Sequence, residues 1–335
     1  MTRERLAGTC RFVFNPYHAC YWTLSGALTD LGTLGGMYSS ARAVNNLGQI
    51  VGYSSDASNG QRAFLWTPTG GMQALPTLGS DPDDLANAIN KSGEVVGVSR
   101  LTPEGPFHAF FWSSSGGIRD LGTLPGDNDS DASGINSTNH VVGSSSDLND
   151  AVRAFMWTQA GGMQELAPTS GLLHYRALAI NDKNEVVGEF LNPADNKQHA
   201  FLWTQSGGIQ DLGVLAGDSS SAVAIDKTGQ LIVGRGTGSS PSSGYGLLWR
   251  SGEIFELDAL AGGIHLGGGA VGINSSGEII ANQGSNGVLL RPSWVKLSSR
   301  SINFGTVAVG QTSSARNLII TNIASLTMSA LSNTF

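Results

Sequence analysis

Short apolar stretches alternate with glycine-containing turns along the chain, and the spacing of an amphipathic helix is absent throughout. Four apolar stretches recur in every ~45 residues. They predict four β-strands, named A to D here. A tight turn joins A to B, a longer loop joins B to C, and a second tight turn joins C to D. The pattern therefore indicates a repeated, four-stranded antiparallel unit.

Two markers keep the same period. Strand C carries a tryptophan in six successive units, at Trp22, Trp66, Trp112, Trp157, Trp203 and Trp249. Strand A ends at Asn or Asp, at Asn45, Asn90, Asn136, Asn181, Asp226 and Asn274. We expect the tryptophans to pack between neighbouring units rather than to form a platform for sugars.

The tight turns have recognisable chemistry. The A–B turn starts with Asn or Asp, whose side chain can close an Asx turn, and its fourth residue is Gly or Asn, as in Asn45 to Gly48. Gly and Asn tolerate a positive φ best. A glycine pair such as Gly70-Gly71 marks the C–D turn. Both turns predict β-hairpins.

Repeated four-stranded units of this length are typical of a β-propeller, whose blades bury their faces against one another. Six complete units run from about residue 39 to 297, preceded by a C–D pair at 18–34. The pair either completes the last blade or, with a strand at 10–14, forms its own blade. We predict an all-β propeller of seven four-stranded blades, with six blades as the alternative and a parallel solenoid as a more distant one.

Composition narrows the function classes. The chain has 335 residues, 46 glycines, 40% hydrophobic residues and only 13% charged residues, which fits many packed strands and tight turns. A net charge of −7 with 19 Lys and Arg argues against binding to nucleic acid. No apolar run reaches the ~18 residues of a membrane-spanning helix. We expect a monomer.

The repeats resemble the HAF family of bacterial extracellular repeats, named for a His-Ala-Phe triplet. The triplet or a variant of it occurs at 18–20, 62–64, 108–110, 153–155 and 199–201. The family's DLGTL stretch is found at 30–34 and 120–124, and its INxxGxVVG stretch at 89–97. The resemblance covers about residues 18–290. It implies an extracellular or cell-surface location in a bacterium, and it implies no catalytic residue.

The repeat pattern stops near residue 298, which suggests a propeller domain at 1–297 and a second segment at 298–335. Residues 301–322 are similar to the opening strands of the Ig-like sandwich domains that bacterial surface proteins carry. A complete sandwich needs about 100 residues, so we expect a truncated Ig-like segment.

Both cysteines, Cys10 and Cys20, lie near the N-terminus. Two cysteines make no disulfide framework and match no zinc pattern, so two unrelated thiols are the favoured interpretation. A local bridge would need an oxidising compartment. The N-terminal segment is not a convincing signal peptide, because Arg11 interrupts its apolar stretch.

The two ends of the blades differ. The A–B and C–D turns are alike in every unit, whereas the B–C and D–A loops vary, which predicts a binding surface on the loop side. Strand C starts there with a polar residue, and the candidate ligand-binding residues are His18, Arg62, His108, Arg153 and His199. Such a ring can meet a carboxylate or a sugar. The alternative is pairing inside each blade with strand D acids, which recurrence in every blade favours.

Asp127, Asp129 and Asp131 alternate in one D–A loop, a spacing that can converge oxygen ligands on Ca²⁺. Ala132 and Thr138 replace the glycine and the glutamate of an EF-hand loop, so a solvated loop is favoured over a metal site. These three aspartates are the candidate metal ligands, and Ca²⁺ is the candidate cofactor.

No motif of nucleophilic, metalloprotease or phosphate-binding chemistry occurs. We predict a non-catalytic, extracellular or cell-surface propeller that binds or displays, with a polysaccharide or a surface protein as partner. One alternative is a propeller-type glycoside hydrolase or lyase, with convergent carboxylates beside a His or Arg at the channel mouth. The other is a gene fragment without independent function, which the ragged N-terminus and the short C-terminal segment favour.

Overall fold

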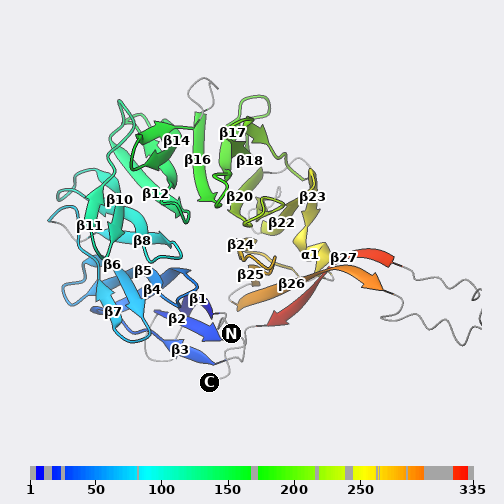
Figure 1. Cartoon of the computed structure of the whole chain (residues 1–335), viewed down its shortest axis with the longest axis horizontal. Coiled ribbons are helices and arrows are strands. Elements are labelled where there is room, and N and C mark those ends of the chain that lie inside the picture. Colours follow the sequence, from blue (N-terminus) through cyan, green and yellow to red (C-terminus); the bar gives the residue numbers. More distant parts are fainter. Residues whose placement is uncertain are drawn as a thin grey trace, which may run out of the picture.

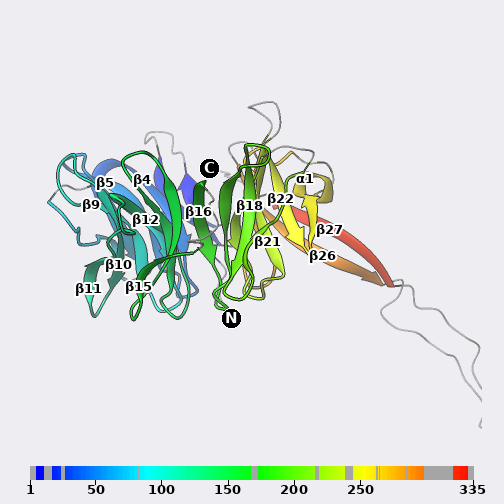
Figure 2. The same ribbon diagram turned by 90° about the horizontal axis from the view of Figure 1, so that it is seen from above.

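The computed structural model is a seven-bladed β-propeller, with seven antiparallel sheets arranged in a ring (Figure 1). It describes residues 5–10, 17–23, 27–80, 83–166, 173–215, 219–237, 244–261, 263, 265–283, 286–297 and 320–330. The predicted fold class is confirmed, with seven blades rather than six. Figure 2 shows the ring edge-on as a thick disc.

Blades 2 to 6 each contain four strands in the order of the sequence. Blade 2 holds β4 (Gly35–Val44), β5 (Ile50–Asp56), β6 (Gln61–Thr67) and β7 (Gly71–Ala74). Blade 3 holds β8 (Asp84–Ile89), β9 (Val95–Arg100), β10 (Phe107–Ser113) and β11 (Gly117–Asp120). Blade 4 holds β12 (Asp129–Ile135), β13 (Val141–Ser146), β14 (Val152–Thr158) and β15 (Gly162–Glu165). Blade 5 holds β16 (Leu173–Ile180), β17 (Val186–Asn192), β18 (Lys197–Thr204) and β19 (Gly208–Asp211). Blade 6 holds β20 (Ser219–Ile225), β21 (Leu231–Thr237), β22 (Gly244–Arg250) and β23 (Glu253–Glu256), followed by the single-turn helix α1 (Leu257–Leu260).

The first blade is made by the N-terminal segment itself. It contains three strands, β1 (Arg5–Cys10), β2 (His18–Thr23) and β3 (Leu28–Asp30), in that order. The N-terminal strands therefore do not complete the last blade. The added strand lies at Arg5–Cys10 rather than at 10–14, where residues 11–14 lie outside the described part of the chain.

Blade 7 takes its outer strand from the segment beyond residue 297. It contains β24 (Ala270–Ile273), β25 (Ile279–Gln283), β26 (Asn286–Leu297) and β27 (Ile320–Ala330), and β26 pairs with β27 along most of its length. The expectation of a complete fourth strand before residue 298 is therefore wrong. The boundary at 297 and the Ig-like identity of 298–335 stay predictions, and residues 301–319 lie outside the described ranges.

The tight turns form as predicted. The Asn45 side-chain oxygen accepts hydrogen bonds from the backbone amides of Leu47 and Gln49, both at 3.0 Å. Gly48, the fourth residue, has a φ of 73°, the left-handed conformation that glycine adopts at no steric cost. In the C–D turn, the Gly70 amide donates to the Thr67 hydroxyl at 2.9 Å. The local sequence thus determines both hairpins.

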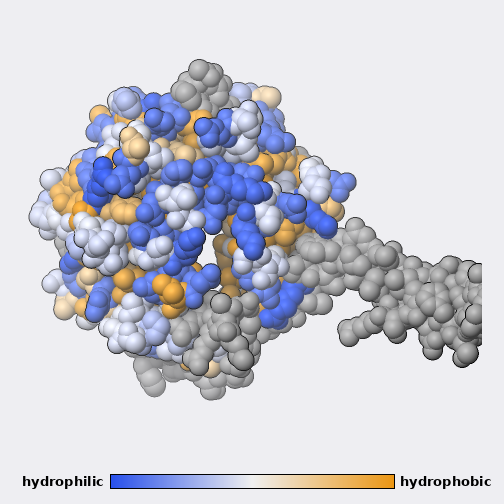
Figure 3. Space-filling model, viewed as in Figure 1, coloured by the Kyte–Doolittle hydropathy of each residue, from blue (hydrophilic) through white to orange (hydrophobic). Residues whose placement is uncertain are grey.

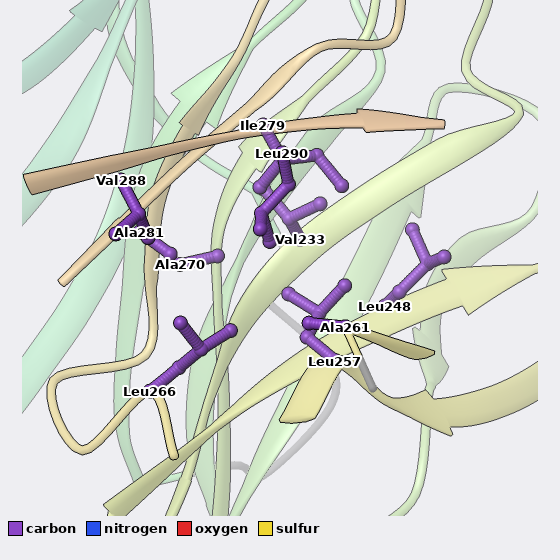
Figure 4. Close-up of a cluster of buried hydrophobic side chains, with 10 residues drawn as sticks. All are labelled: Val233, Leu248, Leu257, Ala261, Leu266, Ala270, Ile279, Ala281, Val288 and Leu290. Carbon is purple, nitrogen blue, oxygen red and sulfur yellow. The ribbon is translucent and has the colours of Figure 1, made fainter. Parts of the chain in front are cut away.

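The hydrophobic core lies between blades rather than within one. One cluster joins Val96 and Ala109 of blade 3 to Val141 and Phe155 of blade 4. Figure 4 shows the cluster between blades 6 and 7, where α1 contributes Leu257. The α1 helix replaces the loop that follows strand D in other blades. Among the described residues, no helix is long and apolar enough to span a membrane.

The tryptophans fill the contact between blades, as predicted. Trp157 and Trp249 are 3% and 4% exposed. Two indole nitrogens also donate to carbonyl groups of the preceding blade, Trp203 to Leu166 at 2.9 Å and Trp249 to Leu212 at 3.0 Å. These two indole N–H groups are therefore satisfied across the blade contact, whereas Trp22 Nε1 is buried with no hydrogen-bond partner among the described residues.

Cys10 and Cys20 form a disulfide, so the interpretation of two unrelated thiols is wrong. The reason is the register of blade 1, in which Cys10 pairs with His18 and Gly8 pairs with Cys20. Cys10 and Cys20 are thus diagonal neighbours on one face of adjacent antiparallel strands, close enough for a bond between them.

Candidate functional site

The predicted ring of polar residues at the start of strand C is built into the blades by local pairing. In three blades a histidine Nδ1 lies against a strand D aspartate of the same blade. The distances are 3.0 Å for His18–Asp30, 2.9 Å for His108–Asp120 and 2.8 Å for His199–Asp211. Each pair spans neighbouring strands that are in register, so the repeat places every histidine beside its acid.

A serine of the next blade completes this arrangement. The Ser130 hydroxyl accepts a hydrogen bond from the Ala109 amide at 2.8 Å and donates to the Gly122 carbonyl at 2.6 Å. Asp120 accepts from the Gly122 amide at 2.7 Å, which holds that turn. Ser39 and Ser220 make the equivalent bonds in their blades. The HAF triplet, the DLG turn and this serine therefore form one hydrogen-bonded joint between neighbouring blades.

The charge state of the joint follows from its hydrogen bonds. The hydrogen bond to Asp120 raises the pKa of His108 more than its burial lowers it. Burial raises the pKa of Asp120, but hydrogen bonds from His108 and the Gly122 amide outweigh burial and bring it below its usual value. Between these two pKa values His108 is protonated and Asp120 is ionised, so the two side chains form an ion pair.

Arg62 replaces the histidine in blade 2, and its acid comes from elsewhere. Ala74 occupies the strand D position, so the carboxylate is supplied by Asp84 of the next blade, 3.7 Å from Arg62 Nε. Asp84 is 1% exposed and stands where the other blades have the joint serine. The loss of one acid is thus compensated by another at the same contact.

Arg153 differs from the other strand C residues of the ring because it pairs with two carboxylates from different loops and strands. It pairs with Asp127 at 2.6 Å and with Glu165 at 3.2 Å, and it donates to the Pro125 carbonyl at 2.9 Å. The Tyr175 hydroxyl of blade 5 donates to the second Glu165 oxygen. The hydrogen bond to Asp127 contributes most to a raised pKa of Arg153. One guanidinium therefore joins two carboxylates on the loop side of blade 4.

The three predicted metal ligands have separate partners. Asp127 pairs with Arg153, Asp129 accepts from the Phe107 amide at 2.8 Å, and Asp131 accepts from the Asn87 side chain at 2.8 Å. Within the described ranges, no group of three His, Cys, Asp or Glu residues is arranged to hold a metal ion. The aspartates are not brought together, and the Ca²⁺ site stays a prediction.

Asp131 belongs instead to a polar chain on the innermost strands. Arg42 of β4 donates to Asn87 of β8 at 3.3 Å, and Asn87 donates to Asp131 of β12. Burial raises the pKa of Asp131 to about 6, although Arg42, Arg176 and the Asn87 hydrogen bond act in the opposite direction. Figure 3 shows an opening at the centre of the ring, with hydrophilic residues along part of its rim. This chain crosses three blades and was not predicted from the sequence.

A second unpredicted feature is a relay of asparagines between blades. The side-chain amide of each donates to the carbonyl of its equivalent in the next blade, in the steps Asn45 to Asn90, Asn90 to Asn136, Asn136 to Asn181 and Asn181 to Asp226. The distances are 3.0 to 3.2 Å. The signal in the sequence was the preference for Asn over Asp, since only the amide can donate.

Comparisons with known proteins identify the fold alone. No family model matches the chain, and no curated protein matches its sequence. The structure is similar to TolB from Acinetobacter baumannii, with a TM-score of 0.51 and 10% identity over 87% of this chain and 77% of TolB. It is also similar to puromycin hydrolase (TM-score 0.53, 11% identity, 86% of this chain and 50% of that one). A third similar structure is oligogalacturonate lyase in complex with manganese (TM-score 0.51, 8% identity, 86% and 82%).

Proposed function

We propose that this propeller is a non-catalytic binding or display module of the cell surface or the extracellular space, with a polysaccharide or a surface protein as partner. The main support for this proposal is the difference between the two sides of the disc. One side consists of near-identical hydrogen-bonded turns, and the other of loops that differ in length and charge on a rigid scaffold. Variation on one side of a repeated scaffold is typical of binding surfaces.

The three strand C histidines contribute to this surface through their partners, whereas Asp84 and Asp127, the partners of Arg62 and Arg153, are buried. Asp30, Asp120 and Asp211 have side chains that are 40 to 41% exposed, whereas His18, His108 and His199 lie largely beneath them. A held carboxylate with free oxygen lone pairs can accept hydrogen bonds from sugar hydroxyls or from a protein's amides. We therefore place ligand contacts on these acids and the surrounding loops, and the histidines hold the acids in place.

The disulfide supports the proposed location. Disulfides persist in oxidising compartments and are rare in the cytosol. The bond between Cys10 and Cys20 joins β1 to β2, so the redox state of the compartment affects whether blade 1 is cross-linked. This agrees with the extracellular location that the HAF resemblance implies.

The glycoside hydrolase or lyase alternative needs two carboxylates with different protonation states near one bond. Asp127 and Glu165 come together, but both pair with the single guanidinium of Arg153, so the two carboxylates share one cationic partner rather than having different surroundings. Asp131 has a raised pKa, and the charged groups that act on it are Arg42 and Arg176 rather than a second carboxylate. The geometry therefore favours binding over hydrolysis.

The test is a glycan array together with pull-down from bacterial surface extracts, using the wild type and the triple variant Asp30→Asn, Asp120→Asn, Asp211→Asn. The amides keep an acceptor for each histidine but remove the charge, so we expect binding to fall by roughly tenfold. Glu253→Gln, on the side of the tight turns, is the matched control and should bind as the wild type. Release of reducing ends or unsaturated products from any polysaccharide would overturn the proposal, as would the absence of any ligand.

A further inference from the structure

The innermost strands of the propeller form a ring that is open at one position. In blades 2 to 7 the innermost strands are β4, β8, β12, β16, β20 and β24. Blade 1 begins with β1, which pairs with β2 as the second strand of every other blade pairs with its third. Among the described residues, blade 1 thus has counterparts of strands B, C and D and none of strand A.

Gly8 identifies β1 as a strand of the B type. It pairs with Cys20 as Gly52 pairs with Phe64 and Gly97 pairs with Phe110. At five equivalent glycines a Cβ atom would lie only 1.9 to 2.0 Å from a backbone oxygen of strand A, at Gly52, Gly97, Gly143, Gly188 and Gly234. Those blades require glycine because the neighbouring backbone approaches so closely.

Among the described residues, no backbone atom approaches Gly8 in this way. A Cβ atom there would meet only the Trp22 ring, at 3.2 Å. The exception among the equivalent positions is Ala281 of blade 7, whose partner strand β24 has only four residues. Gly8 therefore leaves room for a backbone that would lie against it.

No strand of the described residues pairs with the inner edge of β1. The Ala19 carbonyl accepts from the Leu31 amide on the β3 side, so the backbone groups of Ala19 point away from β1. Its register partner Thr9 accordingly points its own N–H and C=O away from β2, and so does Ala7, two residues along. These groups face the position that strand A occupies in the other blades.

A groove lies along this edge. It has a volume of about 720 Å³ and is lined by residues 6–9 of β1, residues 41–44 of β4, residues 271–273 of β24 and Asn274. Trp22 of β2 and several residues between 278 and 289 of blade 7 complete its wall. An extended segment of six residues is ~20 Å long, and β8 has six residues. The groove thus lies between the innermost strands of blades 2 and 7, where the seventh would lie.

The asparagine relay is interrupted at the same place. The Asn274 amide donates to Glu278 of its own turn at 2.8 Å, as Asn45 and Asn181 donate within theirs, but among the described residues it has no bond to a next blade. At the other side of the groove, the Asn45 carbonyl accepts the Gly48 amide, and the Asn90 carbonyl accepts both the Gly93 amide and the Asn45 side chain. A strand that ended in asparagine would accept from Asn274 and donate to Asn45.

We propose that the inner edge of β1 is an acceptor site for one extended strand of another polypeptide, which adds to blade 1 as its innermost strand. The occupant has the pattern of this chain's own A strands, with small residues where it crosses Gly8 and asparagine at its end. Main-chain hydrogen bonds to Ala7 and Thr9 supply affinity, and the close approach at Gly8 supplies selectivity for small residues. This site is on the channel side, and it does not depend on the proposed ligand surface of the loops.

The probe is a fluorescent peptide with the sequence of residues 39–46, Ser-Ser-Ala-Arg-Ala-Val-Asn-Asn. We expect saturable binding to the wild type by fluorescence anisotropy, and slower hydrogen exchange at the Ala7 and Thr9 amides when the peptide is bound. Thr9→Pro removes one inner-edge N–H without affecting a bond to β2. It should weaken binding by at least ~10-fold. Thr9→Ala is the matched control, because it too loses the 2.7 Å hydrogen bond to Ser40 but keeps the N–H, and it should bind as the wild type.

Gly8→Val is the second variant, which decides the result if Thr9→Pro does not fold. Its side chain points to the Trp22 ring, which can shift, and would block an added backbone, so binding should be lost. No saturable binding to the wild type up to about 1 mM, equal binding by a scrambled peptide, or equal binding by both blocking variants would overturn the site. Polysaccharide binding at the loops should be the same in Thr9→Pro and the wild type, so failure of this proposal and failure of the proposed function give different results.

Discussion

The side-chain amide of Asn90 donates to the backbone carbonyl of Asn136 at 3.2 Å, across 46 residues of sequence and from one blade to the next. Asn136 repeats the same contact to Asn181. Each asparagine therefore closes its own hairpin turn with its oxygen and holds the neighbouring blade with its nitrogen. This dual use makes the relay a sensitive point for stability.

Asn136→Ala is expected to lower the free energy of unfolding by roughly 2 to 4 kcal/mol, because it removes the hydrogen bonds that Asn136 accepts from the Thr138 and His140 amides and the one that it donates to the Asn181 carbonyl. Urea unfolding followed by tryptophan fluorescence measures the change. Asn46→Ala, at an exposed position of an equivalent turn, should be close to neutral. Similar losses for both variants would contradict a special role of the relay.

The His108–Asp120 pair should make stability depend on pH in a defined window. Because the pKa of His108 is raised, its contribution is complete below the unfolded value of 6.5 and is lost as the pH rises through the folded value. Because the pKa of Asp120 is lowered, its contribution is present above 3.8 and is lost as the pH falls through the folded value. We expect His108→Ala to be more destabilising at about pH 5.5 than at about pH 8.5. A pH-independent difference between the two proteins, measured by urea unfolding, would refute this.

Asp131 has the opposite dependence. Its pKa is raised to about 6, so its ionisation costs stability as the pH rises from about 4 to 7. The variant Asp131→Asn cannot ionise and keeps an oxygen acceptor for Asn87. Its stability relative to the wild type should therefore increase over this pH range, which thermal unfolding at several pH values can measure. A relative stability that falls with pH would show that Arg42 and Arg176 dominate over burial.

Arg62 and Asp84 should behave as a coupled pair. Arg62→Ala leaves the buried carboxylate of Asp84 without its cation and is expected to cost about 3 kcal/mol. The double variant Arg62→Ala, Asp84→Ser introduces the serine that blades 2, 4 and 6 have at this position and should recover much of that loss. Chemical denaturation of the single and double variants gives the coupling energy. Additive losses would contradict the compensation between Ala74 and Asp84.

The disulfide should stabilise blade 1 more than the rest of the ring. Removing a bridge that closes a loop of this size costs roughly 2 to 3 kcal/mol. For Cys10→Ala, Cys20→Ala we expect faster hydrogen exchange in β1 and β2 and unchanged exchange in blades 3 to 5. A reductant should reproduce this effect in the wild type and have none in the variant. Uniform loss of protection over all blades would indicate that blade 1 cannot open independently.

Several contacts of the candidate site were accessible from the sequence because they are local or periodic. The pairing of His18 with Asp30 was recognised as an alternative, since residues at fixed places on neighbouring strands meet in every blade. The Arg62–Asp84 pair was not, because it depends on which side chain of the next blade reaches the contact. Gly8 occupies the position of the glycine that recurs in strand B. One glycine in a short segment is weak evidence for that strand, because the strand A backbone that requires glycine in the other blades is not found beside it among the described residues.

The repeated blade and its turns could be predicted from the sequence, because hairpin chemistry and strand alternation act over a few residues, whereas seven and six blades both remained open. Asn45 and Gly48 specify their turn wherever the chain places it. The completion of the ring became clear from the folded chain: β1 starts a blade of its own, β27 is the outer strand of blade 7, and Cys10 bonds to Cys20. Those outcomes depend on how separate segments of the chain pair with one another, and such pairing leaves no local pattern from which it could be predicted.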